Sequence, residues 1–122
     1  MVVEFHEKFK QGFNTTPRLI TKDESDLRYR LGKEELDEYQ EAVDDGNIIE
    51  VADSLADQLY ILLGTVIKHG LQDMIIPAFD LVHQNNMAKL GPDGEPILRE
   101  DGKVMKPEGF RKVELSTLFE QK

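Results

Sequence analysis

The chain has 122 residues and a formal net charge of −9, with 24 acidic residues against 15 basic ones. This length suits one domain with a modest core, and we expect a single domain over residues 1–122. The acidity argues against binding to nucleic-acid polymers or to membranes, because both need a cationic surface. Cysteine is absent and no apolar stretch could span a bilayer, so we expect a cytoplasmic protein.

Helical periodicity accounts for most of the first 90 residues. Thr21 with Glu24 has the spacing of a capping box at the start of a long helix, and Asn47 is a second predicted N-cap. About three residues separate the two long helices, so these helices should lie antiparallel side by side. Pro77 should kink a fourth helix. The sequence predicts a four-helix bundle-like core with helices over residues 3–11, 23–45, 47–69 and 71–90.

The pattern changes after about residue 90. Glycine and proline mark a loop at residues 91–94, and residues 96–105 are typical of a small β-hairpin that turns at Asp101-Gly102. A last short helix is expected over residues 114–120. The predicted fold class is therefore all-α, with a helical core at about 3–90 and a hairpin and tail at about 91–122.

Acidic side chains on the two long helices are predicted to face the core. With about 100° per residue and Glu34 set to zero, apolar residues of the first of these helices cover an arc from about 20° to 200°. Glu38 at about 40° and Glu35 at about 100° lie inside this arc. The second long helix carries its own stripe of acids within about 60°, formed by Glu50, Asp53 and Asp57.

Antiparallel pairing about the turn sets acids of the two helices level with each other. The predicted pairs are Glu41 with Glu50, Glu38 with Asp53, and Glu34 with Asp57. Facing carboxylates in a partly buried seam repel and lose hydration, so the seam needs a cation. Oxygen ligands without His or Cys favour Mg²⁺, or else Mn²⁺. The alternative is that both stripes are solvated faces and that Glu50 serves only as a capping residue.

These carboxylates also resemble a family signature. Glu34-Glu35-Leu-Asp-Glu38 followed by Glu50-Val-Ala-Asp53 is similar to the EExxE…ExxD pattern of the all-α nucleotide pyrophosphohydrolases. Further segments at 52–65, 82–90 and 99–107 resemble the branch that is MazG-like and phosphoribosyl-ATP pyrophosphohydrolase-like, so the resemblance covers nearly the whole chain. One departure is Val113, which stands where this branch should have a proline.

The resemblance implies an activity and a set of site residues. The activity is Mg²⁺-dependent cleavage of ribo- or deoxyribonucleoside triphosphates to the monophosphate and pyrophosphate, in nucleotide-pool housecleaning. Glu34, Glu35 and Glu38 are the expected catalytic residues, with Glu34 either a further metal ligand or the base that orients water. The expected metal ligands are Glu35, Glu38, Glu50 and Asp53.

Three residues near the end of the chain are candidates for contacts with the substrate: Asn86, Lys89 and Lys106. The alternative is that Asn86 is a buried amide bonded to backbone and that Lys89 only complements a helix dipole. Wide apolar coverage of the third and fourth helices predicts a homodimer or a dimer of dimers. The alternative function is a non-catalytic helical binding or regulatory module of the same fold.

Overall fold

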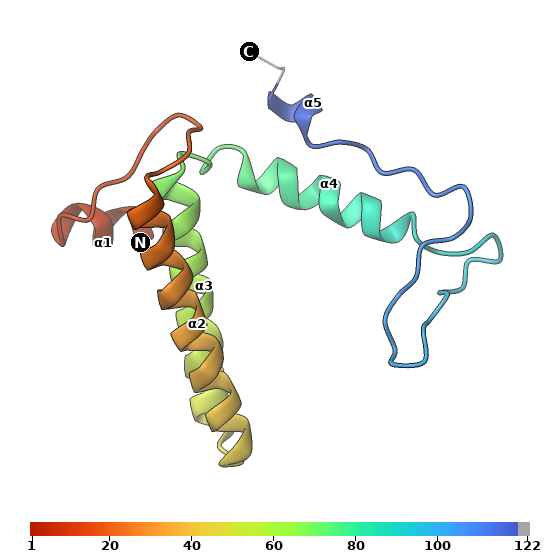
Figure 1. The fold of residues 1–122 in the computed structure, drawn as a ribbon, viewed down its shortest axis with the longest axis horizontal. Helices are drawn as coiled ribbons and strands as arrows, with labels where there is room; N and C mark the ends of the chain where they lie inside the picture. The colour runs from red at the N-terminus through yellow and green to blue at the C-terminus, as the bar shows by residue number, and fades with distance from the viewer. Residues whose placement is uncertain (120–122) are drawn as a thin grey trace. The chain divides into compact units, whose positions relative to one another are not determined.

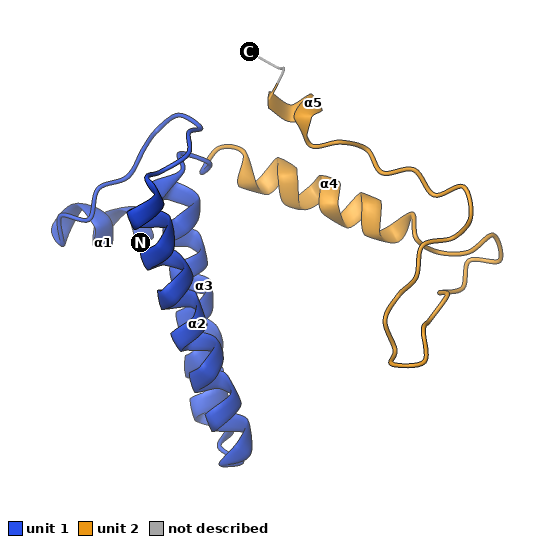
Figure 2. Cartoon of the chain, viewed as in Figure 1, with its two compact units in different colours: residues 1–72 blue, residues 73–122 orange. Residues whose placement is uncertain are grey.

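The computed structural model describes residues 1–119, and its regular secondary structure is helical, which confirms the all-α part of the predicted fold class (Figure 1). The chain divides into two compact units, residues 1–72 and 73–122 (Figure 2). No helix in the described range is long and apolar enough to cross a membrane. The five helices of this range are α1 (Val2–Lys8), α2 (Lys22–Asp44), α3 (Ile48–Lys68), α4 (Ile75–Met87) and α5 (Ser116–Phe119).

Both predicted N-caps of the first unit are confirmed. The Thr21 hydroxyl accepts a hydrogen bond from the Glu24 backbone N–H at 3.2 Å and starts α2. The Asn47 side chain accepts from the backbone N–H groups of Ile49 and Glu50 at 3.1 and 3.2 Å and starts α3. Each cap satisfies amides that the first turn of a helix leaves without partners.

A tight turn joins α2 to α3, and the two helices lie side by side as an antiparallel pair (Figure 1). Gly46 takes a positive φ of 64° in this turn, a conformation that costs glycine little. Ala42 on α2 and Ser54 on α3 are both buried. Such small side chains allow close packing of two helices, so the pair is a firm scaffold for the side chains that face across it.

Helix α1 packs against α3 in the same unit. Phe5 meets Tyr60 edge to face with ring centroids 5.6 Å apart, and His6 is 3% exposed. Gly64 makes room for this packing, because a Cβ at that position would collide with the guanidinium of Arg28 and press on the His6 ring. The structure ends α1 at Lys8, three residues before the predicted end.

In the second unit, the predicted kink at Pro77 is wrong. Helix α4 starts at Ile75, so Pro77 is the third residue of its first turn. Amides in the first turn have no partner within the helix, and a proline there removes no hydrogen bond. Residues 72–74, which were expected to be helical, form a turn instead.

The predicted β-hairpin over residues 96–105 is also wrong. The turn at Asp101-Gly102 forms, with Gly102 N–H donating to Arg99 O at 2.8 Å. Within residues 1–119, however, only one isolated bridge pairs Leu98 with Val104, and no strand results. The physical reason is the flanking sequence: residues 96 and 107 are prolines, which cannot donate backbone hydrogen bonds to extend a ladder.

The tail after the turn is hydrogen-bonded to α4 through Asn85. Asn85 is 7% exposed, and its side chain donates to Val113 O and accepts from Val113 N–H, both at 3.0 Å. A proline at 113 could not donate the second bond, so the departure at this position fits the local structure. The last helix, α5, is shorter than the predicted range 114–120, of which residue 120 lies outside the described part. The four-helix bundle-like core and the single domain stay predictions.

Candidate metal centre

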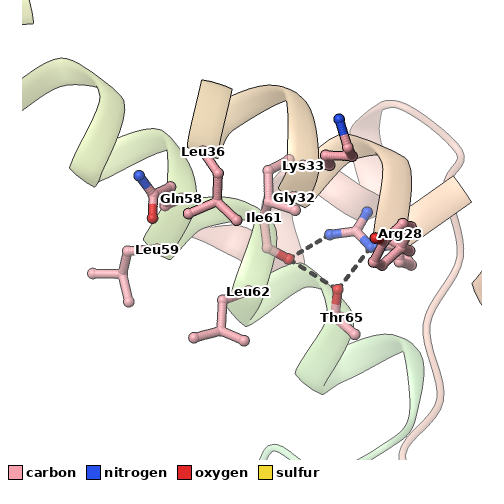
Figure 3. Close-up of a pocket in the computed structure, with 10 residues that line it drawn as sticks. Arg28, Gly32, Lys33, Leu36, Gln58, Leu59, Ile61, Leu62 and Thr65 are labelled. Atoms are coloured by element: carbon pink, nitrogen blue, oxygen red, sulfur yellow. Dashed lines mark hydrogen bonds between the residues drawn. The ribbon is translucent and has the colours of Figure 1, made fainter. Parts of the chain in front are cut away.

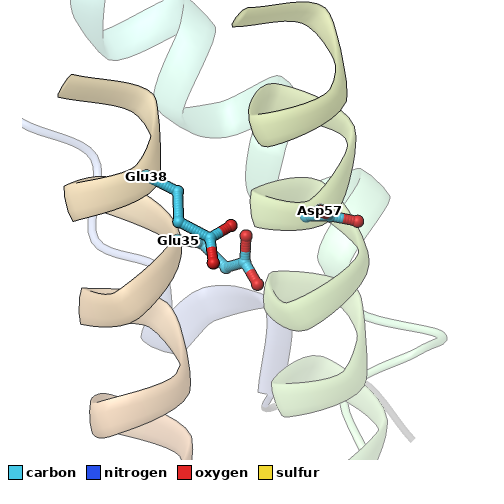
Figure 4. A group of neighbouring side chains, drawn as sticks. All are labelled: Glu35, Glu38 and Asp57. Carbon is cyan, nitrogen blue, oxygen red and sulfur yellow. The ribbon is translucent and has the colours of Figure 1, made fainter. Parts of the chain in front are cut away.

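Three carboxylates meet in the middle of the α2–α3 pair. One oxygen each from Glu35, Glu38 and Asp57 lies within 4.8 Å of the others. Figure 4 shows Glu35 and Glu38 next to each other on α2 and Asp57 on the neighbouring α3. Glu35 and Asp57 are half-buried and Glu38 is exposed. We call these three residues the acidic cluster.

Glu35 is the electrostatically strained member of the acidic cluster. Its Oε2 atom is buried and has no hydrogen-bond partner among the described residues. Burial raises the pKa of Glu35 to about 7, and the carboxylates of Glu38, Asp57 and Asp53 reinforce the shift. A carboxyl group in this setting either keeps its proton near neutral pH or requires a cation. An orphaned buried oxygen in an all-oxygen donor set therefore fits a hard divalent ion such as Mg²⁺.

A second group of acids lines a hollow of about 400 Å³ nearer the turn. Its carboxylates come from Glu38 and Glu41 on α2, from Asp45 in the turn, and from Glu50 and Asp53 on α3. We call this the turn-end hollow. Glu38 belongs to both groups, so the two sets of carboxylates form one continuous acidic face along the helix pair.

The four predicted metal ligands are divided between the two acidic groups, with Glu38 common to both, and Glu34 belongs to neither. Glu35, Glu38, Glu50 and Asp53 all lie in the acidic cluster or the turn-end hollow, whereas Glu34 is exposed and is in neither. Sequence reasoning left Asp57 out of the ligand set and placed it level with Glu34. The available signal was its position one helical turn after Asp53, on the same face.

The predicted substrate-binding residues lie in the second unit. Asn86 is exposed and accepts a hydrogen bond from Lys89 Nζ at 2.9 Å. Lys106 is exposed, with its Nζ 5.8 Å from the centroid of the Phe110 ring. The buried amide on α4 is the neighbouring Asn85, so the structural role weighed for Asn86 belongs to Asn85. The roles of Asn86, Lys89 and Lys106 in substrate binding stay predictions.

The other side of the α2–α3 pair carries an apolar groove that sequence reasoning did not identify (Figure 3). The groove has a volume of about 550 Å³. Arg28 reaches into it from α2, donating from Nε to Thr65 Oγ1 at 2.9 Å and from Nη2 to Ile61 O. Burial lowers the pKa of Arg28. The apolar groove is lined mainly by Tyr29, Gly32, Leu36, Leu59 and Leu62.

All of these acids lie in a stretch of the chain that matches a known protein family. The model of the phosphoribosyl-ATP pyrophosphohydrolase family matches residues 2–86, a stretch that includes every acid of the cluster and the hollow. Among solved structures, the chain is similar to a provisionally assigned NTP pyrophosphohydrolase from Exiguobacterium sp. 255-15. That likeness has 28% identity and a TM-score of 0.48, and covers 98% of this chain and 89% of the other. No curated protein matches the chain.

Proposed function

The chain belongs to the phosphoribosyl-ATP pyrophosphohydrolase family, and from this premise we propose that it is a Mg²⁺-dependent nucleoside triphosphate pyrophosphohydrolase. It would convert (d)NTP to (d)NMP and pyrophosphate in nucleotide-pool housecleaning, in the cytoplasm. The observation that carries the proposal is the orphaned, buried Oε2 of Glu35 inside a cluster of carboxylates. Such an arrangement favours a divalent cation, and a cation is what a triphosphate substrate requires.

The proposed roles follow from where the carboxylates lie. Glu35, Glu38, Glu50 and Asp53 are the proposed metal ligands. When bound, Mg²⁺ offsets the charge of the phosphate oxygens and polarises the phosphorus that is attacked. Glu34, exposed beside the cluster, is the proposed base that orients water and takes its proton. The water oxygen bonds to the α-phosphorus, the α–β anhydride bond breaks, and pyrophosphate leaves with its electron pair.

The charge of the chain supports a substrate that arrives with a cation. At −9, the protein repels a free triphosphate, and a divalent ion in the acidic cluster would offset part of the local negative charge and bind the phosphate oxygens directly. Asn86, Lys89 and Lys106 are the proposed contacts to the base or the phosphates. Lys89 and Lys106 lie beyond the family match, which ends at residue 86.

We propose that the protein is a homodimer or a dimer of dimers. The support is the apolar groove, where Leu36, Leu59 and Leu62 are 56%, 56% and 59% exposed. Large apolar patches of this kind are typical of interfaces between subunits. Light scattering coupled to size-exclusion chromatography tests the oligomeric state.

The activity is tested by pyrophosphate release from all common NTPs and dNTPs and from phosphoribosyl-ATP, with Mg²⁺ and with EDTA. We expect Mg²⁺-dependent release that the double variant Glu38→Ala, Asp53→Ala abolishes. Asp37→Asn is the control, because Asp37 is an exposed acid of α2 paired with Lys33. Full activity of the double variant would refute the proposed site. Absence of both pyrophosphate release and calorimetric Mg²⁺ binding would instead favour the non-catalytic regulatory module.

A further inference from the structure

The EExxE…ExxD pattern accounts for two of the three carboxylates in the acidic cluster, and Asp57 is the third. We propose that Asp57 is a protein ligand of the cation held by Glu35 and Glu38, which gives the site a carboxylate that the pattern does not contain. This inference rests on the proposed function, because it concerns the same Mg²⁺ site.

The distances in the acidic cluster suit one small cation. Oxygen ligands lie about 2.1 Å from Mg²⁺, so two of them on opposite sides of the ion are about 4.2 Å apart. The oxygens of Glu35, Glu38 and Asp57 already lie within 4.8 Å of one another. Adjacent ligands of an octahedral ion are only about 3 Å apart, so the three side chains would have to rotate toward the ion to share one coordination shell.

The position of Asp57 along α3 separates its role from that of Asp53. Four residues of α-helix span about 6 Å, so Asp53 and Asp57 sit at different levels of the same acidic face. Asp53 lines the turn-end hollow with Glu50, whereas Asp57 groups with Glu35 and Glu38. An ion at the level of Glu35 thus has Asp57 as a further ligand from α3, beside the carboxylates that the pattern supplies.

A second observation concerns the ion pairs formed in the described part of the chain. Within residues 1–119, no ion pair includes Glu35, Glu38 or Asp57. The Oε2 atom of Glu35 is moreover buried without a hydrogen-bond partner in the described range. Half-buried carboxylates normally have a lysine, an arginine or a hydrogen-bond donor beside them. Here a bound ion is the compensation that the three side chains lack.

The test is Mg²⁺ titration by calorimetry together with thermal unfolding in EDTA and in Mg²⁺, without nucleotide. It compares the full-length wild type with Asp57→Asn and with the control Asp37→Asn, which removes the same charge from the same helix pair. We expect Asp57→Asn to weaken Mg²⁺ binding at least about tenfold. The substitution should also raise the unfolding temperature in EDTA, because it relieves repulsion between the carboxylates. It should reduce the further rise in unfolding temperature that Mg²⁺ produces. The control should leave both properties unchanged.

The possible outcomes distinguish a failure of the inference about Asp57 from a failure of the proposed function. Wild-type affinity in Asp57→Asn would overturn the inference about Asp57 while leaving the proposed function intact. Equal loss of stability in EDTA and in Mg²⁺, or failure of the variant to fold, would also overturn it, because a purely structural aspartate behaves in that way. A wild-type protein that binds no Mg²⁺ would overturn the proposed function as well.

Discussion

On the two faces of the α2–α3 pair, burial disfavours charges of opposite sign. On one face, burial raises the pKa of Glu35 among other carboxylates. On the other, burial lowers the pKa of Arg28, which donates hydrogen bonds to neutral oxygens of Thr65 and Ile61. Glu38 and Leu36 are about 160° apart on the helix, so one short stretch of α2 serves both faces. A single helix pair can therefore present one face that requires a cation and another whose apolar side chains require a packing partner.

The largest expected effect is on the acidic face. Glu38→Gln should lower the rate of pyrophosphate release by about a thousandfold, because a metal contributes several kcal/mol to such a transition state and Glu38 belongs to both acidic groups. Steady-state kinetics at saturating Mg²⁺ measures this loss. Leu62→Ala in the apolar groove is the matched change on the other face, and an equal loss of rate there would break the distinction between the faces.

Two glycines near the groove should respond in opposite ways. A Cβ at Gly64 would collide with the Arg28 guanidinium, whereas a Cβ at Gly32 meets nothing within 4 Å. Gly64→Ala should lower the free energy of unfolding by about 1–3 kcal/mol. Gly32→Ala should raise it by up to about 1 kcal/mol, as expected for an alanine in an open helix. Denaturant unfolding measures both.

The Gly32→Ala variant also sharpens the proposal of a dimer. If a helix of a second copy packs closely over the groove, the added methyl group will weaken association even though the isolated chain is more stable. Sedimentation velocity over a range of concentrations separates these effects. A variant that gains stability and keeps the same oligomeric state would place the subunit contact elsewhere.

The acidic face should make stability depend on pH. Because the folded pKa of Glu35 is about 7, above its ordinary 4.5, the folded state retains this proton longer than the unfolded state. In EDTA, the proton on Glu35 therefore makes its full contribution to the free energy of unfolding below pH 4.5. This contribution is lost as pH rises toward 7. Glu35→Gln should remove this part of the slope. Thermal unfolding across this pH range tests it, and parallel curves for the two proteins would contradict the assigned pKa.

The smallest expected effect belongs to the scaffold that both faces share. Thr21→Ala removes the N-cap of α2 and should lower the free energy of unfolding by about 1 kcal/mol. Thr15→Ala, in an exposed loop position, is the control. Calorimetric Mg²⁺ affinity should stay at the wild-type value, and a large loss of affinity would mean that the cap also positions the acidic face.

The features predicted correctly depend on interactions that are local in sequence. Thr21 and Asn47 cap helices through amides two or three residues away, and such spacings can be read directly. The errors at Pro77 and at the hairpin are different, because each pattern allows two local structures. A proline can begin a helix as well as kink one, and a turn at Asp101-Gly102 can form without the ladder that would follow it.

The site was predictable only as far as helical periodicity extends. Periodicity places Glu35 and Glu38 on the core-facing side of one helix and Glu50, Asp53 and Asp57 in one stripe of the other, but the partner of Asp57 depends on the vertical offset between the two helices. The apolar groove was missed because Arg28 reaches residues more than thirty positions away, at Ile61 and Thr65. Side-chain contacts of that range have no signature in a single sequence.

The brevity of the turn between α2 and α3 also bears on how fast the chain folds. Only residues 45–47 separate the two helices, so the contacts nearest the turn are close in sequence and can form first. Contacts at the far end of the pair, such as Arg28 with Thr65, then follow. The carboxylates of the two helices come together only as the helices dock, and the unfolded chain offers no assembled site to an ion. Mg²⁺ should therefore act mainly on the unfolding rate, lengthening the lifetime of the docked pair more than it hastens docking.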